Sequence, residues 1–176
     1  MRIAISGAHR TGKTTLAGVL GRELTGYVSV DEPYDSLAEE GYAFAAFPSV
    51  ADFEAQLERS LASVLHCDPD CIFDRCPADL LAYLITHRDA GQFDLEAWLQ
   101  RVHGAMTQVD LVVFVPVEHP DRIPVSEDDF GDLRDQINAE LRDILLDDRW
   151  GFGVPAIEVT GTVDARAHQV LAHIRR

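Results

Sequence analysis

One eight-residue motif near the start of the chain constrains its fold most strongly. Residues 7–14, GAHRTGKT, match the pattern G-x-x-x-x-G-K-[ST] without a mismatch. They follow Arg2 to Ser6, a short apolar run typical of a strand, and they open a segment of helical periodicity. A glycine-rich turn of this kind also occurs as a simple connector. The complete pattern in this setting predicts the Walker A motif, a loop that binds phosphate groups.

The residue types of this loop fit that chemistry. Glycines let the backbone turn its N–H groups inward, and the helix N-terminus adds its positive end. Lys13 is predicted to reach the β- and γ-phosphates and the Thr14 hydroxyl to bind Mg²⁺. Lys13 is the only lysine among 15 basic residues, at the one position that needs a compact ammonium. We expect it to face solvent without ligand. The expected nucleotide-binding residues are Gly7, Ala8, His9, Arg10, Thr11, Gly12, Lys13, Thr14 and Thr15.

The composition argues against several other classes of protein. The 176 residues include 30 acidic and 15 basic side chains, which gives a formal net charge of −15. A surface this acidic disfavours binding to nucleic acid or to an anionic membrane. No window reaches the roughly 20 apolar residues of a membrane span. The three cysteines, Cys67, Cys71 and Cys76, are odd in number, and we identify no signal peptide, so we expect reduced thiols and a cytoplasmic protein.

Short apolar runs alternate with longer segments of helical period, which is typical of α/β proteins with a mainly parallel sheet. The length suits one domain over residues 1–176. Strands are predicted over Arg2–Ser6, Tyr27–Asp31, Asp70–Asp74, Asp110–Val115 and Pro155–Val159. Helices are predicted over Lys13–Leu24, Val50–Leu65, Ala78–His87, Leu95–Met106, Phe130–Leu146 and Val163–Ile174. These elements predict a three-layer sandwich with helices on both faces of the sheet.

Two acidic motifs follow predicted strands. Asp31-Glu32-Pro33 ends the second strand, and Asp74-Arg75 ends the third. Open α/β sheets bind ligands at the carboxyl ends of their strands, so these carboxylates are candidates for a site beside the phosphate loop. Two plainer interpretations stay open. Asp31 or Glu32 before proline suits an ordinary turn, and Asp74 suits a helix cap.

Together these motifs resemble a known family. Residues 6–16, SGAHRTGKTTL, are similar to the phosphate loop of small nucleoside and nucleotide kinase-like proteins, especially ribosylnicotinamide kinase domains and bacterial AAA-like ATP-binding proteins. The Glu-Pro and Asp-Arg pairs look like their counterparts in deoxynucleoside kinases. The resemblance implies a P-loop NTPase fold with strand order 2-3-1-4-5 and an acceptor site near the end of the second strand. It also implies a lid between the fourth and fifth strands.

The resemblance further implies roles for individual residues. Glu32, or else Asp31, is the general base for an acceptor hydroxyl. Asp74 holds Mg²⁺ through water, and Arg75 touches the transferred phosphoryl group or the acceptor. A transition state of phosphoryl transfer gains most from positioning and charge neutralisation, with one carboxylate placed for the hydroxyl proton, and this set of residues agrees with that requirement.

The implied lid covers residues 117–135, with Arg122 and Arg134 as candidates to close over the phosphoryl group. Ordinary surface ion pairs are the alternative for either arginine. Residues 118–148 hold 11 acidic side chains against 3 arginines. We therefore expect the lid to stay open and mobile without ligand, and its arginine to approach the transferred group only on closure.

Aromatic residues fall into two sets with different expectations. The first set lies in the alanine-rich stretch after Glu32 and is a candidate lining for a flat acceptor ring: Tyr34, Tyr42, Phe44 and Phe47. The second set has helical spacing to apolar neighbours and is expected to pack in the core: Tyr83, Phe93 and Trp98.

The sequence thus favours ATP-dependent phosphoryl transfer, with Mg²⁺, to a small nucleoside- or nucleotide-like acceptor. A nucleotide hydrolase and a non-catalytic ATP-binding module are the alternatives. A GTPase is disfavoured, because its N-K-x-D signature needs a lysine other than Lys13 and the chain has none.

Overall fold

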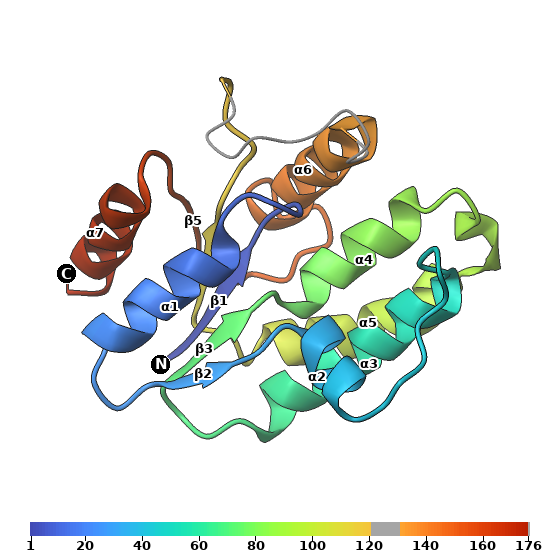
Figure 1. Cartoon of the computed structure of the whole chain (residues 1–176), viewed down its shortest axis with the longest axis horizontal. Coiled ribbons are helices and arrows are strands. Elements are labelled where there is room, and N and C mark those ends of the chain that lie inside the picture. The colour runs from blue at the N-terminus through green and yellow to red at the C-terminus, as the bar shows by residue number, and fades with distance from the viewer. Residues whose placement is uncertain (121–130, 176) are drawn as a thin grey trace.

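The structure, a computed structural model, describes residues 1–120 and 131–175 (Figure 1). Five parallel strands form one sheet in the order β2-β3-β1-β4-β5, which confirms the expected topology. The strands are β1 Arg2–Ser6, β2 Val28–Val30, β3 Cys71–Asp74, β4 Leu111–Phe114 and β5 Ala156–Glu158. The helices are α1 Lys13–Glu23, α2 Pro33–Glu39, α3 Val50–His66, α4 Pro77–Thr86, α5 Leu95–Met106, α6 Gly131–Leu145 and α7 Val163–Ile174, with a short 3₁₀ turn, η1, at Ala90–Gln92.

The central strands are buried on both faces, because their side chains alternate between two apolar cores. Ile3 and Ile5 of β1 point into one core, which α1 and α7 cover. Ala4 points into the other and larger core, to which α3, α4, α5 and α6 contribute. The same alternation holds in β3 and β4, which flank β1. The expected three-layer arrangement is therefore present.

Two helical elements were not expected from the sequence. Pro33, which suits a turn, instead occupies the first turn of α2. Proline is well placed there, because the first helical N–H groups have no partner within the helix and the fixed φ angle suits a helix start. The second is η1, a single turn between α4 and α5. β2 is shorter than predicted at both ends.

The aromatic residues Tyr83 and Phe93 are buried in the larger core, and Trp98 packs against it, as expected. Among the residues that the structure describes, no helix combines the length and the apolar character needed to cross a bilayer.

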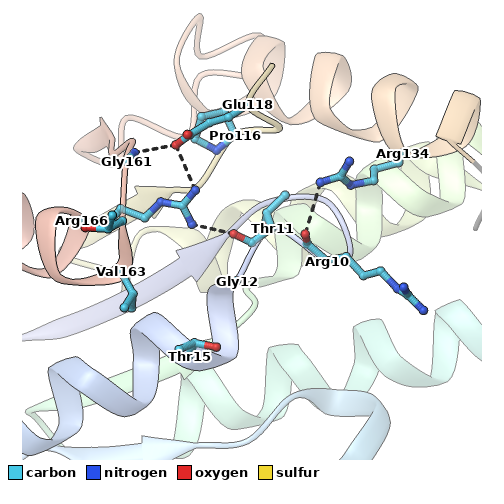
Figure 2. Close-up of a pocket in the computed structure, with 11 residues that line it drawn as sticks. Arg10, Thr11, Gly12, Thr15, Pro116, Glu118, Arg134, Gly161, Val163 and Arg166 are labelled. Carbon is cyan, nitrogen blue, oxygen red and sulfur yellow. Dashed lines mark hydrogen bonds and ion pairs between the residues drawn. The ribbon is translucent and has the colours of Figure 1, made fainter. Parts of the chain in front are cut away.

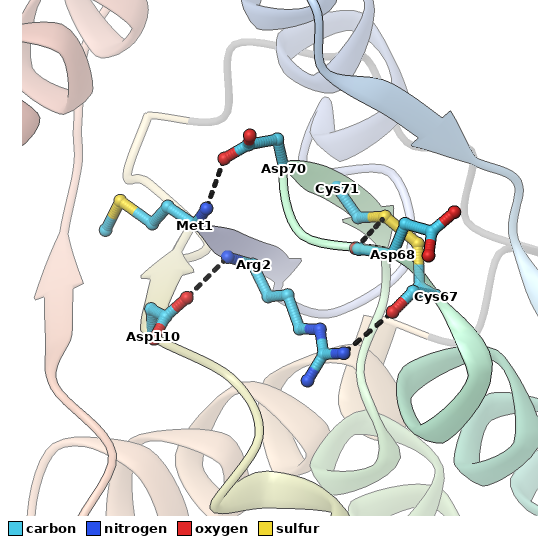
Figure 3. Close-up of a disulfide and its surroundings, with 7 residues drawn as sticks. All are labelled: Met1, Arg2, Cys67, Asp68, Asp70, Cys71 and Asp110. Atoms are coloured by element: carbon cyan, nitrogen blue, oxygen red, sulfur yellow. Dashed lines mark hydrogen bonds and ion pairs between the residues drawn. A yellow bond between two sulfur atoms is a disulfide. The ribbon is translucent and has the colours of Figure 1, made fainter.

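Cys67 and Cys71 form a disulfide, which corrects the expectation of three reduced thiols (Figure 3). α3 ends at His66 and β3 begins at Cys71, so the intervening turn brings the two Cα atoms to 6.8 Å. The Arg2 guanidinium donates to the Cys67 carbonyl at 2.7 Å and ties this turn to the start of β1. Cys76 is a buried free thiol. The cysteine count therefore no longer supports the expected reducing location.

A capping box begins α3. The Ser49 hydroxyl accepts from the Asp52 N–H at 3.2 Å, and the Asp52 carboxylate accepts from the Ser49 N–H at 2.8 Å. The Tyr42 hydroxyl also contacts Asp52, at 3.3 Å. Asp52 therefore joins the start of α3 to the segment that follows α2.

We expect Asp52→Ala to lower the free energy of unfolding by about 1 kcal/mol, because it leaves the Ser49 N–H without its cap. Asp164→Ala is the matched control, since this exposed carboxylate lies in the first turn of α7 outside any capping box. The control should lose about 0.5 kcal/mol or less. Urea unfolding of both variants measures the difference, and equal losses would show that the capping box adds nothing.

Candidate active site

The loop between β1 and α1 needs glycine at two positions. Gly7 has a φ of 151°, and a Cβ there would lie 2.3 Å from the Val115 carbonyl oxygen at the end of β4. Gly12 has a φ of 87° and forms the N-cap of α1, where no side chain caps the helix. The first helical N–H groups lack partners within a helix, so this end of α1 is suited to bind an anion.

Buried cations bond the carbonyl groups of this loop. The carbonyl oxygens of residues 7 to 11 each accept a hydrogen bond from the side chain of Arg75, Lys13, Arg134 or Arg166. The distances are 3.3 Å from Arg75 Nη1 to residue 7, 2.7 Å from Lys13 Nζ to residue 8, 3.0 and 3.2 Å from Arg134 Nε and Nη2 to residues 9 and 10, and 2.6 Å from Arg166 Nη1 to residue 11. We call these four side chains the cation collar. Its bonds fix the direction in which five successive peptide groups point.

Lys13 is buried, with 4% of its surface exposed, which corrects the expectation of a solvent-facing side chain. Its ammonium folds back onto the loop because the Ala8 carbonyl offers an acceptor at 2.7 Å. Burial, followed by the nearby charge of Arg75, lowers the pKa of Lys13 to about 7. The lysine is therefore poised to gain a proton when an anion arrives.

The sheet brings Glu32, at the end of β2, against Arg75, at the end of β3, in an ion pair. Burial by itself would raise the pKa of Glu32, but the charge and hydrogen bond of Arg75, helped by Lys13, lower it below its ordinary value. Arg75 has a left-handed backbone with a φ of 78°. Non-glycine residues adopt this conformation only where surrounding contacts hold it, and such residues cluster at functional sites. Glu32 is thus held ionised at the sheet edge.

Two residues of α4 join this network in roles that the sequence analysis missed. Asp79 is fully buried and accepts from the Gly7 N–H at 3.0 Å, while its other oxygen caps α4 through the Cys76 N–H at 3.0 Å. Tyr83 lies one turn later, and its hydroxyl accepts from the His9 N–H at 3.1 Å. A sequence signal for Asp79 was available. It lies three positions after Cys76, with Pro77 between them, which is the pattern of a capping box at a helix start. Tyr83 follows on the same helix face.

Asp74 and Thr14 fit the magnesium role that the sequence suggests. Asp74 is buried, and its Oδ1 has no hydrogen-bond partner in the part of the chain that the structure describes. Burial raises the pKa of Asp74, while the Thr14 hydroxyl and the Lys13 charge oppose that rise. Mg²⁺ prefers oxygen ligands and takes only one or two from the protein beside a nucleotide. A carboxylate with one unsatisfied oxygen, next to a hydroxyl, is a donor set of that type.

A cavity of about 410 Å³ adjoins the loop on the side of β4 and β5 (Figure 2). Its walls come from the phosphate loop, from the segment after β4, from the start of α6 and from the turn between β5 and α7. The lining residues are Arg10, Thr11, Gly12, Thr15, Pro116, Glu118, Arg134, Gly161, Thr162, Val163 and Arg166. The sequence analysis missed the role of the lining residues outside the phosphate loop and Arg134, among them Arg166, because nothing in the local pattern links it to residue 11.

The predicted lid is described only in part. Residues 121–130, with Arg122, lie outside the described residues. Arg134 is buried and donates to the carbonyls of His9 and Arg10 in the phosphate loop, and its approach to a transferred group on closure stays a prediction. Its helix, α6, contributes four buried apolar side chains to the larger core, so this end of the lid region is part of the packed fold.

The remaining candidates are spread more widely. Asp31 is exposed, in contrast to Glu32. Tyr34 and Phe44 stack with ring centroids 4.3 Å apart, and Tyr42 contacts Phe44 at 4.6 Å. Phe47 is 72% exposed. The structure therefore gathers three of the four aromatic residues after Glu32 into one cluster.

The fold and the loop geometry define a P-loop protein of the α/β class. The chain belongs to the AAA domain family, which matches residues 2–166. No curated protein matches the sequence.

Solved structures with this fold include several kinases. Deoxyadenosine kinase from M. mycoides superposes with a TM-score of 0.68 at 17% identity, over 99% of this chain and 98% of that one. Thymidylate kinase from Ehrlichia chaffeensis has a TM-score of 0.67 at 14% identity, over 100% and 98% of the two chains. NadR protein in complex with NAD and AMP-PNP has a TM-score of 0.69 at 16% identity, over 98% of this chain and 48% of that one. The resemblance inferred from the sequence is thus confirmed for the fold.

We expect the affinity of this loop for ADP to fall as pH rises above about 7. The phosphates favour the ammonium form of Lys13. At pH values where Lys13 is neutral in the free protein, ADP binding therefore takes up one proton. The affinity for ADP then falls by up to about tenfold for each unit that the pH rises. Above pH 7 the terminal phosphate, with a pKa of about 6, no longer changes its charge. Calorimetry between pH 7.5 and 9 measures the effect.

Lys13→Arg is the control for this titration, because a guanidinium stays charged throughout the range. Whatever ADP affinity this variant retains should be independent of pH. A flat profile in the unaltered protein would show that Lys13 is fully charged before binding.

Proposed function

We propose that this protein transfers the γ-phosphoryl group of ATP to a hydroxyl of a small acceptor of the nucleoside or nucleotide class. The observation that carries the proposal is the placement of groups along the sheet edge. The loop follows β1 in the centre, the cavity lies toward β4 and β5, and Glu32 and Asp74 lie toward β2 and β3. A donor nucleoside in the cavity would direct its phosphates across the loop toward these carboxylates.

The residues support a balanced transfer step. The acceptor hydroxyl oxygen forms a bond to the γ-phosphorus, and the bond from that phosphorus to the oxygen bridging it to the β-phosphorus breaks, which leaves ADP. The hydroxyl proton passes to the Glu32 carboxylate. Arg75 keeps Glu32 ionised, and a weak base is sufficient because the transition state for phosphoryl transfer has little bond formation to the nucleophile.

The collar and the loop supply the electrostatic part of catalysis. Lys13 and the N-terminus of α1 would face the β- and γ-phosphates, and Arg134 lies at residues 9 and 10 of the loop. Arg75 bonds both Glu32 and the Gly7 carbonyl, which supports a role for it at the phosphoryl group or the acceptor. Asp74 and Thr14 would hold Mg²⁺, which when bound neutralises charge on the phosphate oxygens.

The aromatic cluster beside Glu32 supports an acceptor with a flat ring. Tyr34, two positions after the proposed base, stacks on Phe44 and is 44% exposed, so part of its ring remains accessible. The structural relatives include enzymes named for a deoxynucleoside, a nucleotide and shikimate, so the acceptor must be found by experiment.

A transfer screen tests the function directly. The protein with Mg²⁺ and γ-labelled ATP should label at least one member of a panel of nucleosides, nucleotides and aminoglycosides, separated by chromatography. Lys13→Ala should reduce transfer by about 10²- to 10³-fold or more, because it removes the charge that faces the phosphates. Arg88→Ala, at an exposed arginine outside the site, is the matched control. Release of phosphate without labelled acceptor would identify a hydrolase, and stable bound ATP a non-catalytic module.

We expect Glu32→Gln to lower turnover by about 10²- to 10⁴-fold with little change in ATP affinity, since a general base acts in the transition state. Asp31→Asn serves as the control for the neighbouring exposed carboxylate and should stay near the unaltered rate. The opposite pattern, with the loss in Asp31→Asn alone, would move the base to Asp31. Steady-state kinetics at saturating acceptor separate the two.

A further inference from the structure

Arg166, in the first turns of α7, reaches from the far end of the chain to the phosphate loop. Its Nη1 donates to the Thr11 carbonyl at 2.6 Å, and its Nη2 donates to Glu118 Oε1 at 3.0 Å (Figure 2). The side chain is only 8% exposed. One guanidinium thus bridges a loop peptide and a carboxylate that are 107 positions apart in the sequence.

Glu118 extends this bridge to a fourth segment. The same Oε1 accepts from the Gly161 N–H at 2.6 Å, in the turn between β5 and α7. The network therefore joins the loop after β1, the segment after β4, the turn after β5 and the helix that follows. All four contribute to the wall of the cavity.

The chemistry of Arg166 suits holding a peptide group more than binding a phosphate. Both of its terminal nitrogens are engaged, and charge-assisted bonds of this kind are about twice as strong as neutral ones. Its Nε is buried without a partner in the part of the chain described here. Burying a guanidinium is costly unless it is paired, so Glu118 and Thr11 hold the side chain in one position.

We propose that Arg166 is a positioning residue for the phosphate loop, and that Glu118 orients it. By holding the Thr11 carbonyl outward, Arg166 keeps the following peptide N–H, that of Gly12, turned toward the anion site. This inference rests on the proposed function, because it assigns the loop to phosphate binding. It adds a residue that contacts neither the donor phosphates nor the acceptor.

The proposal also connects the cavity to the loop. A donor nucleoside in the cavity would lie against residues 116–118 and 161–163, which carry Glu118 and its partner Gly161. Contacts there would hold Glu118, and through it Arg166 and the Thr11 peptide, in the arrangement seen here. The nucleoside part of a nucleotide would thereby help to order the loop that binds its phosphates.

Binding and hydrogen exchange together test the positioning role. Arg166→Met should weaken binding of pyrophosphate and of Mg·ADP about tenfold or more and raise the KM for ATP more than it lowers kcat. In the protein without ligand, the amides of His9 and Leu16, which bond Tyr83 and the Gly12 carbonyl, should exchange faster. Arg166→Lys should recover only part of the loss, because one ammonium cannot reproduce the two-pronged bridge. Glu118→Gln should also weaken ligand binding and speed amide exchange, but by less than Arg166→Met does.

Arg101→Met is the matched control, because it removes an exposed arginine that pairs with Glu58 away from the loop. Thermal melting establishes that each variant is folded at the assay temperature. Should Arg166→Met not fold, Arg166→Lys and Glu118→Gln carry the same measurements.

The outcomes separate this inference from the proposed function. Unchanged exchange of the His9 and Leu16 amides and unchanged pyrophosphate affinity in folded variants would overturn the positioning role alone. Failure of the unaltered protein to bind pyrophosphate and Mg·ADP would overturn the proposed function and the phosphate part of this inference. The exchange measurement needs no nucleotide, so it still decides whether Arg166 orders the loop.

Discussion

Five successive carbonyl groups, those of residues 7 to 11, each accept a hydrogen bond from a buried cation, and the rest of the site depends on this arrangement. A peptide group is planar, so fixing its carbonyl also fixes the direction of the N–H on the next residue. The collar therefore fixes the loop through its carbonyl groups, while glycines permit the backbone angles that the turn requires. An anion site prepared in this way loses little free energy to ordering when a ligand binds.

The collar also explains how a chain with a net charge of −15 can present a site for polyphosphates. Its members come from α1, from the end of β3, from α6 and from α7, and all are buried. Charges in such a setting interact more strongly and are screened less by salt than those on the surface. The local field at the loop is thus set by a few buried cations and their partners, Glu32, Asp79 and Glu118, more than by the acidic exterior.

The parallel sheet determines where the parts of this site lie along one edge. Each strand delivers its following segment to the same edge, so five parts of the chain meet there although they are far apart in sequence. Groups suited to proton transfer and to Mg²⁺ follow β2 and β3, while the cavity lies beyond β4 and β5. α4 links the two halves, because Asp79 and Tyr83 bond the backbone of the loop itself. The packing of α4 is therefore coupled to the geometry of the phosphate loop.

The sequence by itself determined the phosphate loop, the alternation of strands and helices and the carboxylates at the ends of β2 and β3. These are local signals, carried by glycine spacing, apolar period and position after a strand. Only the tertiary structure decided that Glu32 pairs with Arg75, that Asp79 and Tyr83 serve the loop, that Cys67 and Cys71 are joined, and that Arg166 reaches Thr11. Each of these contacts, except the disulfide, depends on which strands lie side by side, since the partners are 43 to 155 positions apart. No local pattern encodes such pairings. They arise because burying the two faces of the sheet brings distant segments to one edge.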